Sequence, residues 1–379
     1  MKKALIVSSV ASMIDQFNMD NIKLLKELGY EVHVGTNFDN PGTISMEKSK
    51  NLIKILNSQG VQTFQINFSR SPFDLKNNRV AFSDLKELSK KENYDLVHLH
   101  SPIGGVLGRL VFNKKKTKII YTAHGFHFFK GGKLKDWLLF YPIEYLLSKN
   151  TSILITINKN DYEIAKGFKG KLEVKQIPGV GIDFDRFNKS ITNKISKDDF
   201  IIVSVGELND NKNHIAGIEA IKLLKHLNGI KYIICGVGPK KGEIMNKITE
   251  YELSEKVELV GYSDSVEKYY KNASLFLFPS KREGLGLASL EAMASGLPLV
   301  NTNVGGMKDY TINGVTGFVF SDPENYEQIA KAIEKIYRLN NDEIQQISKN
   351  NTEIASKYSI EIVHELMKEI YLKCCQERK

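Results

Sequence analysis

A glycine-rich run in the second half of the chain carries two glutamates, Glu283 and Glu291, with seven residues between them. The run follows the short apolar stretch Leu275–Phe278, so it predicts a strand, a tight turn over Gly284–Leu287 and the start of a helix. The N–H groups and dipole of a helix start can hold a phosphate or a sugar hydroxyl. Each carboxylate can accept a pair of hydroxyl hydrogen bonds, as a polyol or ribose offers. Either glutamate alone is better explained as a capping or exposed residue, but the complete run favours a binding site.

Other motifs are weaker or missing. Gly104, Gly105 and Gly108 open a helical stretch after Pro102, which on its own indicates close helix packing. No glycines follow the first apolar stretch, so the glycine pattern of dinucleotide-binding proteins is absent. The motifs of P-loop nucleotidases, zinc proteases and serine hydrolases are also absent. The sequence therefore disfavours dehydrogenases and these three classes together.

Short apolar runs alternate with helical patterns along the chain, and the pattern restarts near residue 200. Such runs are typical of strands buried on both faces, and the helices between them indicate parallel sheets. The expected strands are Ala4–Ser8, Glu31–Thr36, Leu96–His100, Lys118–Thr122 and Ile153–Ile157, then Phe200–Gly206, Tyr232–Cys235, Val257–Val260, Leu275–Phe278 and Leu299–Thr302. We expect two doubly wound α/β domains that face each other across a cleft, with ligands at the carboxyl ends of the strands.

A polar segment separates the two series of strands. Residues 188–199 are rich in Lys, Ser, Thr, Asn and Asp, which is typical of a linker. The first domain is therefore expected over 1–187 and the second over 200–360, in keeping with a length of 379 residues. The C-terminal stretch has a helical pattern, and its segment 361–379 is a candidate to cross back to the first domain.

The run from Glu283 to Glu291 closely resembles the donor-site signature of retaining glycosyltransferases of family 4. Those enzymes have the GT-B fold of two facing Rossmann-like domains. Further segments resemble the same family, so the resemblance covers essentially the whole chain: Val205–His214, Pro178–Asp183, Gly305–Gly306 and Gly314–Phe318. Two segments of the first half, His98–Gly105 and Tyr121–His127, resemble a subgroup that builds bacterial capsule and exopolysaccharide.

The resemblance implies roles for the matching residues. Glu283 would bind hydroxyls of the donor sugar, Glu291 would hold the ribose, and Lys212 would neutralise the departing diphosphate. His124 matches a family histidine beside the reacting sugar, with a buried histidine bonded to backbone as the plainer alternative. Catalysis would thus rest on His124, Glu283 and Lys212. The donor side would comprise Gly206, Lys212, Arg282, Glu283, Gly284, Leu285, Gly286, Leu287 and Glu291, and the acceptor side His100, Gly104, Gly105 and His127.

Two departures from the family pattern concern phosphate binding. The usual pair of glycines after the first strand is absent. The family usually has an arginine where Glu207 stands, and an acid there would repel the diphosphate. Glu207 must therefore point away or contact another group, and Lys281 or Arg282 is a candidate for the missing cation. The resemblance implies retention, with no cofactor and no metal, since a lysine and backbone N–H groups can stabilise the leaving oxygen.

The charge of the chain is unevenly divided. The formal net charge is +9, but residues 1–190 hold 29 basic and 18 acidic residues while the remainder holds 24 and 26. Lys133, Lys135 and Trp137 beside an apolar helical stretch suit a membrane interface, although a core helix with a lysine-rich entry loop explains them equally well. A polyprenyl-diphosphate-linked glycan at an anionic inner leaflet would account for the basic half. Nucleic acid fits less well, because no helix-turn-helix, RRM or zinc-finger pattern occurs.

The three cysteines are too few and too badly spaced for a disulfide framework or a four-ligand zinc site, which favours a reduced cytoplasm. We therefore expect a cytoplasmic or peripherally membrane-bound glycosyltransferase that moves a sugar from a UDP-linked donor to a lipid-linked glycan. Two alternatives stay open. One is a GT-B-shaped UDP-sugar epimerase, which the two-glutamate run disfavours. The other is a non-enzymatic protein that uses its basic face on a membrane or nucleic acid.

Overall fold

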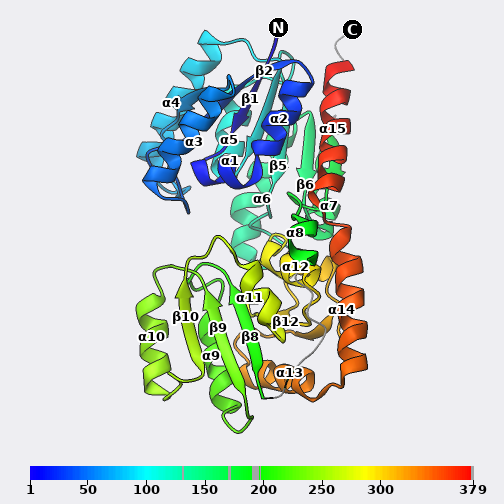
Figure 1. Cartoon of the computed structure of the whole chain (residues 1–379). Coiled ribbons are helices and arrows are strands. Elements are labelled where there is room, and N and C mark those ends of the chain that lie inside the picture. The colour runs from blue at the N-terminus through cyan, green and yellow to red at the C-terminus, as the bar shows by residue number, and fades with distance from the viewer. Residues whose placement is uncertain (130–131, 170–171, 190–195, 197, 377–379) are drawn as a thin grey trace. The chain divides into compact units, whose positions relative to one another are not determined.

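Two units, each built on a parallel sheet, make up the computed structural model (Figure 1), which describes residues 1–129, 132–169, 172–189, 196 and 198–376. The first unit comprises Met1–Val180 and Glu361–Lys379, and the second comprises Gly181–Ile360. The division therefore falls before the linker expected over 188–199, most of which lies outside the described residues. Residues 181–187, expected in the first domain, belong to the second unit.

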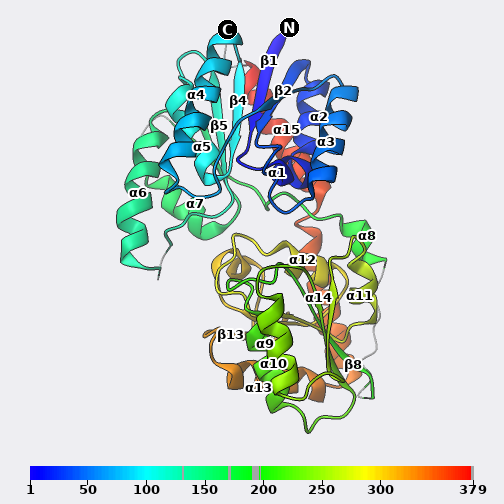
Figure 2. The same cartoon turned by 90° about the vertical axis from the view of Figure 1, so that its left-hand side faces the viewer.

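The first unit alternates strands and helices. Its elements are β1 (Lys2–Val7), α1 (Ala11–Phe17), α2 (Met19–Glu27), β2 (Tyr30–Thr36), α3 (Met46–Ser58), β3 (Gln62–Gln65), α4 (Leu75–Lys91), β4 (Leu96–His100), α5 (Pro102–Val111), β5 (Lys118–Ala123), α6 (Leu134–Ser148), β6 (Ile153–Thr156), α7 (Lys159–Lys166), β7 (Glu173–Gln176) and α15 (Ile360–Gln376). In the described residues the strands form a seven-stranded parallel sheet in the order β3-β2-β1-β4-β5-β6-β7. Helices cover both faces, with α2, α3 and α15 on one side and α4, α5 and α6 on the other (Figure 2).

The second unit repeats this plan. It contains α8 (Phe184–Asn188), β8 (Phe200–Val205), α9 (His214–Leu223), β9 (Ile230–Cys235), α10 (Lys241–Glu250), β10 (Val257–Gly261), α11 (Glu267–Asn272), β11 (Leu275–Phe278), α12 (Leu287–Ala294), β12 (Leu299–Thr302), the short 3-10 helix η1 (Gly305–Asp309), β13 (Gly317–Phe320), α13 (Tyr326–Arg338) and α14 (Asn341–Ser356). Over the part of the chain that is described, its sheet has six parallel strands in the order β10-β9-β8-β11-β12-β13.

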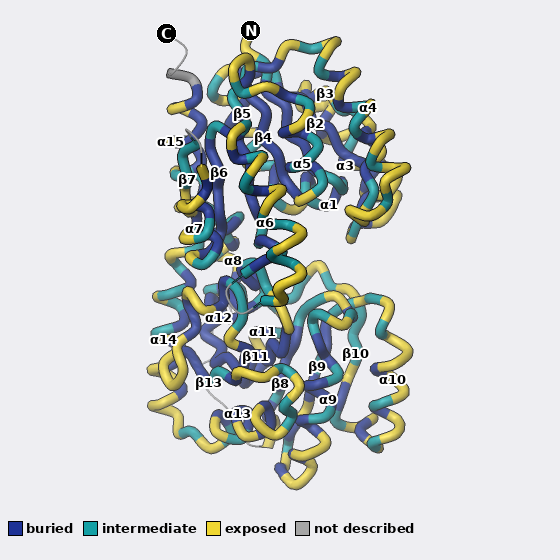
Figure 3. The backbone as a smooth tube through the Cα atoms, turned by 180° about the vertical axis from the view of Figure 1, so that it is seen from behind, coloured by how far each residue is buried: buried dark blue, intermediate teal, exposed yellow. Residues whose placement is uncertain are grey.

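Strands β4, β11 and β12, which lie inside the two sheets, are fully buried, as their continuous apolar sequences predict (Figure 3). Three strands that the sequence did not reveal, β3, β7 and β13, lie at sheet edges. Their burial is incomplete, because only one neighbouring strand and part of a helix layer cover each of them.

The strand order reverses beside the first strand of each sheet. β1 pairs with both β2 and β4, and β8 pairs with both β9 and β11. In open parallel sheets, ligands bind at such a reversal, outside the carboxyl ends of the strands. The turns after β8 and β11, and those after β1 and β4, are therefore the places where site residues are expected.

Candidate functional site

The carboxyl edge of the second sheet brings Lys212 and Glu283 together. Lys212 lies in the turn after β8 and Glu283 in the turn after the adjacent β11. Lys212 Nζ donates to Glu283 Oε1 over 2.7 Å and lies 4.6 Å from the centre of the Phe278 ring. The two side chains are 21% and 10% exposed, so this pair is partly open to solvent. The two residues expected to handle opposite ends of a sugar diphosphate are thus an ion pair at the strand-order reversal.

Backbone contacts hold the two turns against each other. Lys281 N donates to Asn211 O over 2.8 Å, and Asn211 Nδ2 donates to Arg282 O over 2.9 Å. Lys212 N donates to Asn209 Oδ1 within its own turn. Gly206 leaves room for the lysine, since a Cβ there would lie 3.2–3.3 Å from the Lys212 methylenes. The position of Lys212 Nζ is therefore fixed from both turns.

The start of α12 forms the second part of this site. Gly286 caps the helix in the left-handed region at φ +82°, where a side chain would be strained. The buried Tyr310 hydroxyl donates to Leu285 O over 2.7 Å and fixes the turn. Gly305 lies so close to the Glu283 carbonyl that any side chain there would overlap it. The turn Gly284–Leu287 is thus rigid, and the first N–H groups of α12 lie directly after it.

Glu291 lies one turn into α12 and is half-buried. Its Oε2 accepts a hydrogen bond from Tyr270 OH over 3.4 Å. Burial raises the pKa of Glu291 to about 7, although the Tyr270 hydrogen bond acts in the opposite direction. At neutral pH this carboxyl group is therefore poised between its two forms. Sequence reasoning missed Tyr270, because nothing in its local sequence marks a residue on α11 as a partner of Glu291.

The acid that replaces the usual family arginine is held within its own turn. Glu207 is exposed, and its Oε2 accepts from Asn209 Nδ2 over 2.9 Å. Lys281 forms an ion pair with Glu324. Arg282 is exposed, and its side chain has no ion pair among the described residues. Of the two cations considered as replacements, Arg282 is therefore the one available to a phosphate.

The carboxyl edge of the first sheet carries a cluster of three histidines. His100 Nδ1 lies 3.1 Å from His124 Nε2, and the His98 and His100 rings are 4.1 Å apart. His98 is fully buried and bonded on both sides, with Tyr371 OH at 2.7 Å and Thr122 Oγ1 at 2.8 Å. His98 therefore has a structural role, in which it ties α15 to the sheet.

Burial keeps these imidazoles neutral. It lowers the pKa of His98 to about 3 and that of His124 to about 4, and it lowers the pKa of His100 well below its usual value. His100 Nε2 has no hydrogen-bond partner among the described residues. The pair thus carries no charge at neutral pH, and of its two members only the half-buried His124 is accessible, since His100 is 2% exposed.

The other residues expected on the acceptor side have other neighbours in the structure. The His127 ring lies 4.7 Å from the Phe140 ring of α6. A Cβ on Gly105 would come within 2.4 Å of the Tyr121 ring, and one on Gly104 within 2.9 Å of Ser101 Oγ. The glycines therefore let α5 pack closely on the sheet, which is the plainer of the two explanations that their sequence allowed.

The expected membrane-interface residues divide into two kinds. Lys133 and Lys135 are exposed at the start of α6. Trp137 instead packs inward: its Nε1 donates to Phe129 O over 3.0 Å and its ring contacts Phe128 and Tyr141. Apolar exposure on α6 comes from leucines, with Leu134 and Leu138 at 73% and 70%. In the described part of the chain, no helix combines the length and the hydrophobicity needed to span a membrane.

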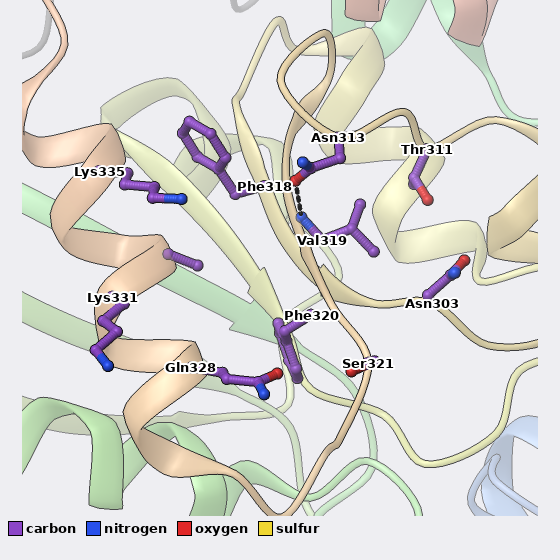
Figure 4. Close-up of a pocket in the computed structure, with 11 residues that line it drawn as sticks. Asn303, Thr311, Asn313, Phe318, Val319, Phe320, Ser321, Gln328, Lys331 and Lys335 are labelled. Atoms are coloured by element: carbon purple, nitrogen blue, oxygen red, sulfur yellow. Dashed lines mark hydrogen bonds between the residues drawn. The ribbon is translucent and has the colours of Figure 1, made fainter.

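A separate pocket of about 510 Å³ lies at the edge strand of the second sheet (Figure 4). Lys331, Lys335 and Gln328 of α13 and Asn303 after β12 line it, but none of the expected donor residues does. Within the described residues, no group of three His, Cys, Asp or Glu side chains could hold a metal ion. Metal independence itself stays a prediction.

Two family models match consecutive parts of the chain. Glycosyl transferase 4-like matches residues 16–158, and Glycosyl transferases group 1 matches residues 185–354. The putative glycosyltransferase EpsD of Bacillus subtilis is 34% identical over 89% of this chain and 87% of its own length. An Escherichia coli relative, UDP-Gal:alpha-D-GlcNAc-diphosphoundecaprenol alpha-1,3-galactosyltransferase, is 28% identical over 76% of this chain and 78% of its own.

Solved structures agree on the fold. Sucrose-phosphate synthase from Thermosynechococcus elongatus superposes with a TM-score of 0.77 at 19% identity and covers all of both chains. HepE of Anabaena, solved with UDP-glucose, gives a TM-score of 0.74 at 17% identity over 98% of this chain and all of its own. The two family models, the long match to the Bacillus protein and these folds lead to one conclusion: the chain belongs to the family 4-like, group 1 glycosyltransferases and has their GT-B fold.

Proposed function

We propose that this protein is a retaining hexosyltransferase that moves a sugar from a UDP-linked donor to a lipid-linked glycan in capsule or exopolysaccharide biosynthesis. Relatives support this choice. The Escherichia coli protein is named for a UDP-galactose donor and a diphosphoundecaprenol acceptor. A Staphylococcus aureus relative, 27% identical over 87% of this chain and 92% of its own length, is named a capsular polysaccharide biosynthesis glycosyltransferase.

The observation that carries the proposal is the Lys212–Glu283 pair beside the start of α12. In the proposed reaction the nucleotide-sugar donor replaces the direct contact between Lys212 and Glu283. Lys212 then holds a phosphate oxygen, and Glu283 accepts hydroxyl hydrogen bonds from the donor sugar. Glu291 accepts the ribose hydroxyls, and Arg282 supplies the second cation.

The proposed chemistry is a substitution at the anomeric carbon. The bond from that carbon to the diphosphate oxygen breaks, and negative charge develops on the leaving oxygen. Lys212 and the N–H groups of α12 stabilise that charge without a metal ion. The acceptor oxygen bonds to the same face of the sugar, and its proton passes to the leaving diphosphate. The configuration is thus retained, and His124 remains our candidate for contact with the reacting sugar.

The proposal places the enzyme in the cytoplasm, where nucleotide sugars are the donors, and on the inner face of the membrane, where the acceptor lipid is anchored. The exposed Lys133 and Lys135 and the exposed leucines of α6 support a surface attachment. A surface attachment also explains the excess of basic residues in the first half of the chain.

A nucleotide-sugar screen tests the proposal. The purified protein is incubated with UDP-, GDP-, TDP- and ADP-linked sugars, with EDTA present, and donor hydrolysis and thermal stabilisation are measured. We expect at least one UDP-sugar to be hydrolysed slowly, and Glu283→Ala to abolish that hydrolysis. Stabilisation by no nucleotide sugar, or equal hydrolysis by Glu283→Ala, would contradict the proposed donor site. An anomeric product of inverted configuration would contradict retention.

A further inference from the structure

The first unit contains a partly open pocket that the donor chemistry does not use. It has a volume of about 250 Å³ and lies among α4, α5 and α6, where α5 packs against both of the other helices. Its walls are mainly apolar and include Ile103, Val106 and Leu107 of α5 and Phe140 and Ile143 of α6. The pocket lies entirely within one unit.

The carboxylate at the pocket is already paired with a cation. Glu144 lines it, but both of its carboxylate oxygens bind Arg109, at 2.8 and 3.1 Å. The Arg109 guanidinium also lies 4.0 Å from the centre of the Tyr121 ring, which lines the same pocket. The Glu144 carboxylate is therefore not free to bind a nucleotide or a sugar, and the mainly apolar walls favour an apolar ligand.

Several apolar side chains at the pocket and on the segments that line it are exposed. Leu75 and Ile143 line the pocket and are still 72% and 38% exposed. Phe73, next to the start of α4, is 71% exposed, and Leu138 and Leu146 of α6 are 70% and 58% exposed. Soluble proteins rarely leave so many large apolar side chains together in water unless they contact a membrane, a ligand or a partner.

Exposed basic residues border this apolar surface. Lys76 and Arg79 are on α4 beside the pocket residue Leu75, and Lys133 and Lys135 are at the start of α6. The nearby acid Asp74 is occupied by hydrogen bonds from Asn77 and Ser69. An apolar pocket with a basic border matches a ligand that has a hydrocarbon chain and a phosphate end.

We propose that this pocket binds the phosphate-proximal part of the polyprenyl chain of the acceptor lipid. The inference rests on the proposed function, because it names the part of the lipid-linked acceptor that the first unit recognises. Whole drug-sized ligands take sites of roughly 300–1,000 Å³. A pocket of 250 Å³ therefore suits a short stretch of unsaturated chain, and the rest of the chain stays in the bilayer.

The test measures binding of soluble prenyl diphosphates to the full-length protein by calorimetry, without vesicles. Farnesyl diphosphate is expected to bind about tenfold or more tightly than geranyl diphosphate, because one further isoprene unit is buried. Inorganic diphosphate is the probe for the phosphate contribution alone. Equal affinity for inorganic and farnesyl diphosphate would overturn the proposal.

Two pairs of variants locate the binding. Val106→Trp fills the pocket and should weaken farnesyl diphosphate binding at least about tenfold, whereas Leu110→Trp, on the exposed side of the same helix, should not. Ile143→Asp places a charge beside the pocket at a partly exposed position that tolerates it, with Leu138→Asp as its control. Wild-type binding by both Val106→Trp and Ile143→Asp would overturn the proposal.

Two further measurements separate the alternatives. If Leu138→Asp weakens farnesyl diphosphate binding as much as Ile143→Asp does, the α6 surface rather than the pocket holds the chain, and the proposal is wrong. Stabilisation by UDP-sugars is measured in the same variants. In Val106→Trp and Ile143→Asp, weakened prenyl binding with intact donor binding is the expected result. In the wild type, donor binding without prenyl binding refutes only the pocket, and prenyl binding without any donor binding refutes only the proposed transferase.

Discussion

Each unit contains one prominent ion pair, and the two differ in burial and geometry. Arg109 and Glu144 in the first unit have side chains 1% and 9% exposed and share two hydrogen bonds. Lys212 and Glu283 in the second unit share one hydrogen bond, and the lysine is 21% exposed. The buried pair is almost inaccessible to a ligand, and Arg109 also donates to Gly105 O. The open pair keeps free donors and acceptors, because a lysine has three N–H groups and a carboxylate has two oxygens.

The difference shows how the same chemical types serve structure in one unit and ligand binding in the other. Separating a buried pair exposes a charge to an apolar environment, which is costly. Separating a partly exposed pair costs little, since water or a phosphate replaces the lost partner. Four substitutions test this comparison.

Glu144→Ala should have the largest effect, on stability. Removal of the carboxylate leaves the Arg109 charge buried without a partner, which costs about 3–5 kcal/mol. Urea unfolding, followed by circular dichroism, measures this loss in the first unit. The control Glu87→Ala removes an exposed pair with Lys91 on α4 and should change stability by at most about 0.5 kcal/mol. If Arg109→Met with Glu144→Leu does not regain most of the stability, unpaired charge is the wrong explanation.

Lys212→Ala should reduce turnover about 10²–10³-fold, because the leaving diphosphate loses its main cation. Its melting temperature should stay close to that of the wild type, in contrast to Glu144→Ala. Transfer or donor hydrolysis is measured beside Lys335→Ala, an exposed lysine on α13 that should behave as wild type. A Lys212→Ala protein with near-normal turnover would remove the distinction between the two pairs.

Tyr371→Phe should have a smaller effect, confined to the first unit. It deletes the hydroxyl bonded to His98 and leaves a buried imidazole nitrogen unpaired, which costs about 1–3 kcal/mol. Tyr326→Phe is the matched change on the surface of the second unit, and it should be nearly neutral. Chemical denaturation compares the two. Equal losses would mean that the Tyr371–His98 bond does not anchor α15.

The pH dependence of donor binding should be the mildest effect. With the pKa of Glu291 raised to about 7, its carboxylate becomes available to ribose as pH rises towards 7. Affinity for a UDP-sugar should therefore increase by at most about tenfold per pH unit between pH 5.5 and 7 and then level off. The probe is a UDP-sugar rather than UDP, because the terminal phosphate of UDP itself titrates near pH 6, about the value for phosphate esters.

Glu291→Gln should remove this dependence. The histidines of the first unit should add nothing, since the pKa values of His98 and His124 are about 3 and 4. The same raised pKa has a consequence for folding: Glu291 stabilises the folded state at acidic pH, and that contribution is lost as pH rises through about 7. A pH dependence that persists in Glu291→Gln would assign the titration to another group.

The sequence predicted those parts of the fold that burial alone determines. The central strands have continuous apolar runs, and Leu275–Phe278 and Leu299–Thr302 begin and end where expected. β3 and β7 were missed because edge strands lack such runs: Gln62–Gln65 has one large apolar residue, and Glu173–Gln176 has one. β13 was missed because it is only four residues long and begins at a glycine. Its two middle residues are only partly buried.

The candidate site was predictable where a local motif marks it and not where distant residues meet. The run from Glu283 to Glu291 and the turn with Lys212 are such motifs, and the structure brings Lys212 and Glu283 into contact. The partners Tyr270 of Glu291 and Tyr371 of His98 come from elements far along the chain. Trp137 suggested an exposed anchor, but the indole packs inward, because a single sequence does not reveal which face of a helix with apolar residues all around it is covered.

The return of α15 to the first unit has a consequence for biosynthesis. Tyr371 and His98 are separated by 273 positions, and all of the second unit is translated between them. On the ribosome the second unit has its complete sequence before Tyr371 emerges, so it can fold while the first unit still lacks its last helix. The face of the first sheet around His98, on the central strand β4, therefore stays uncovered during synthesis until α15 is made.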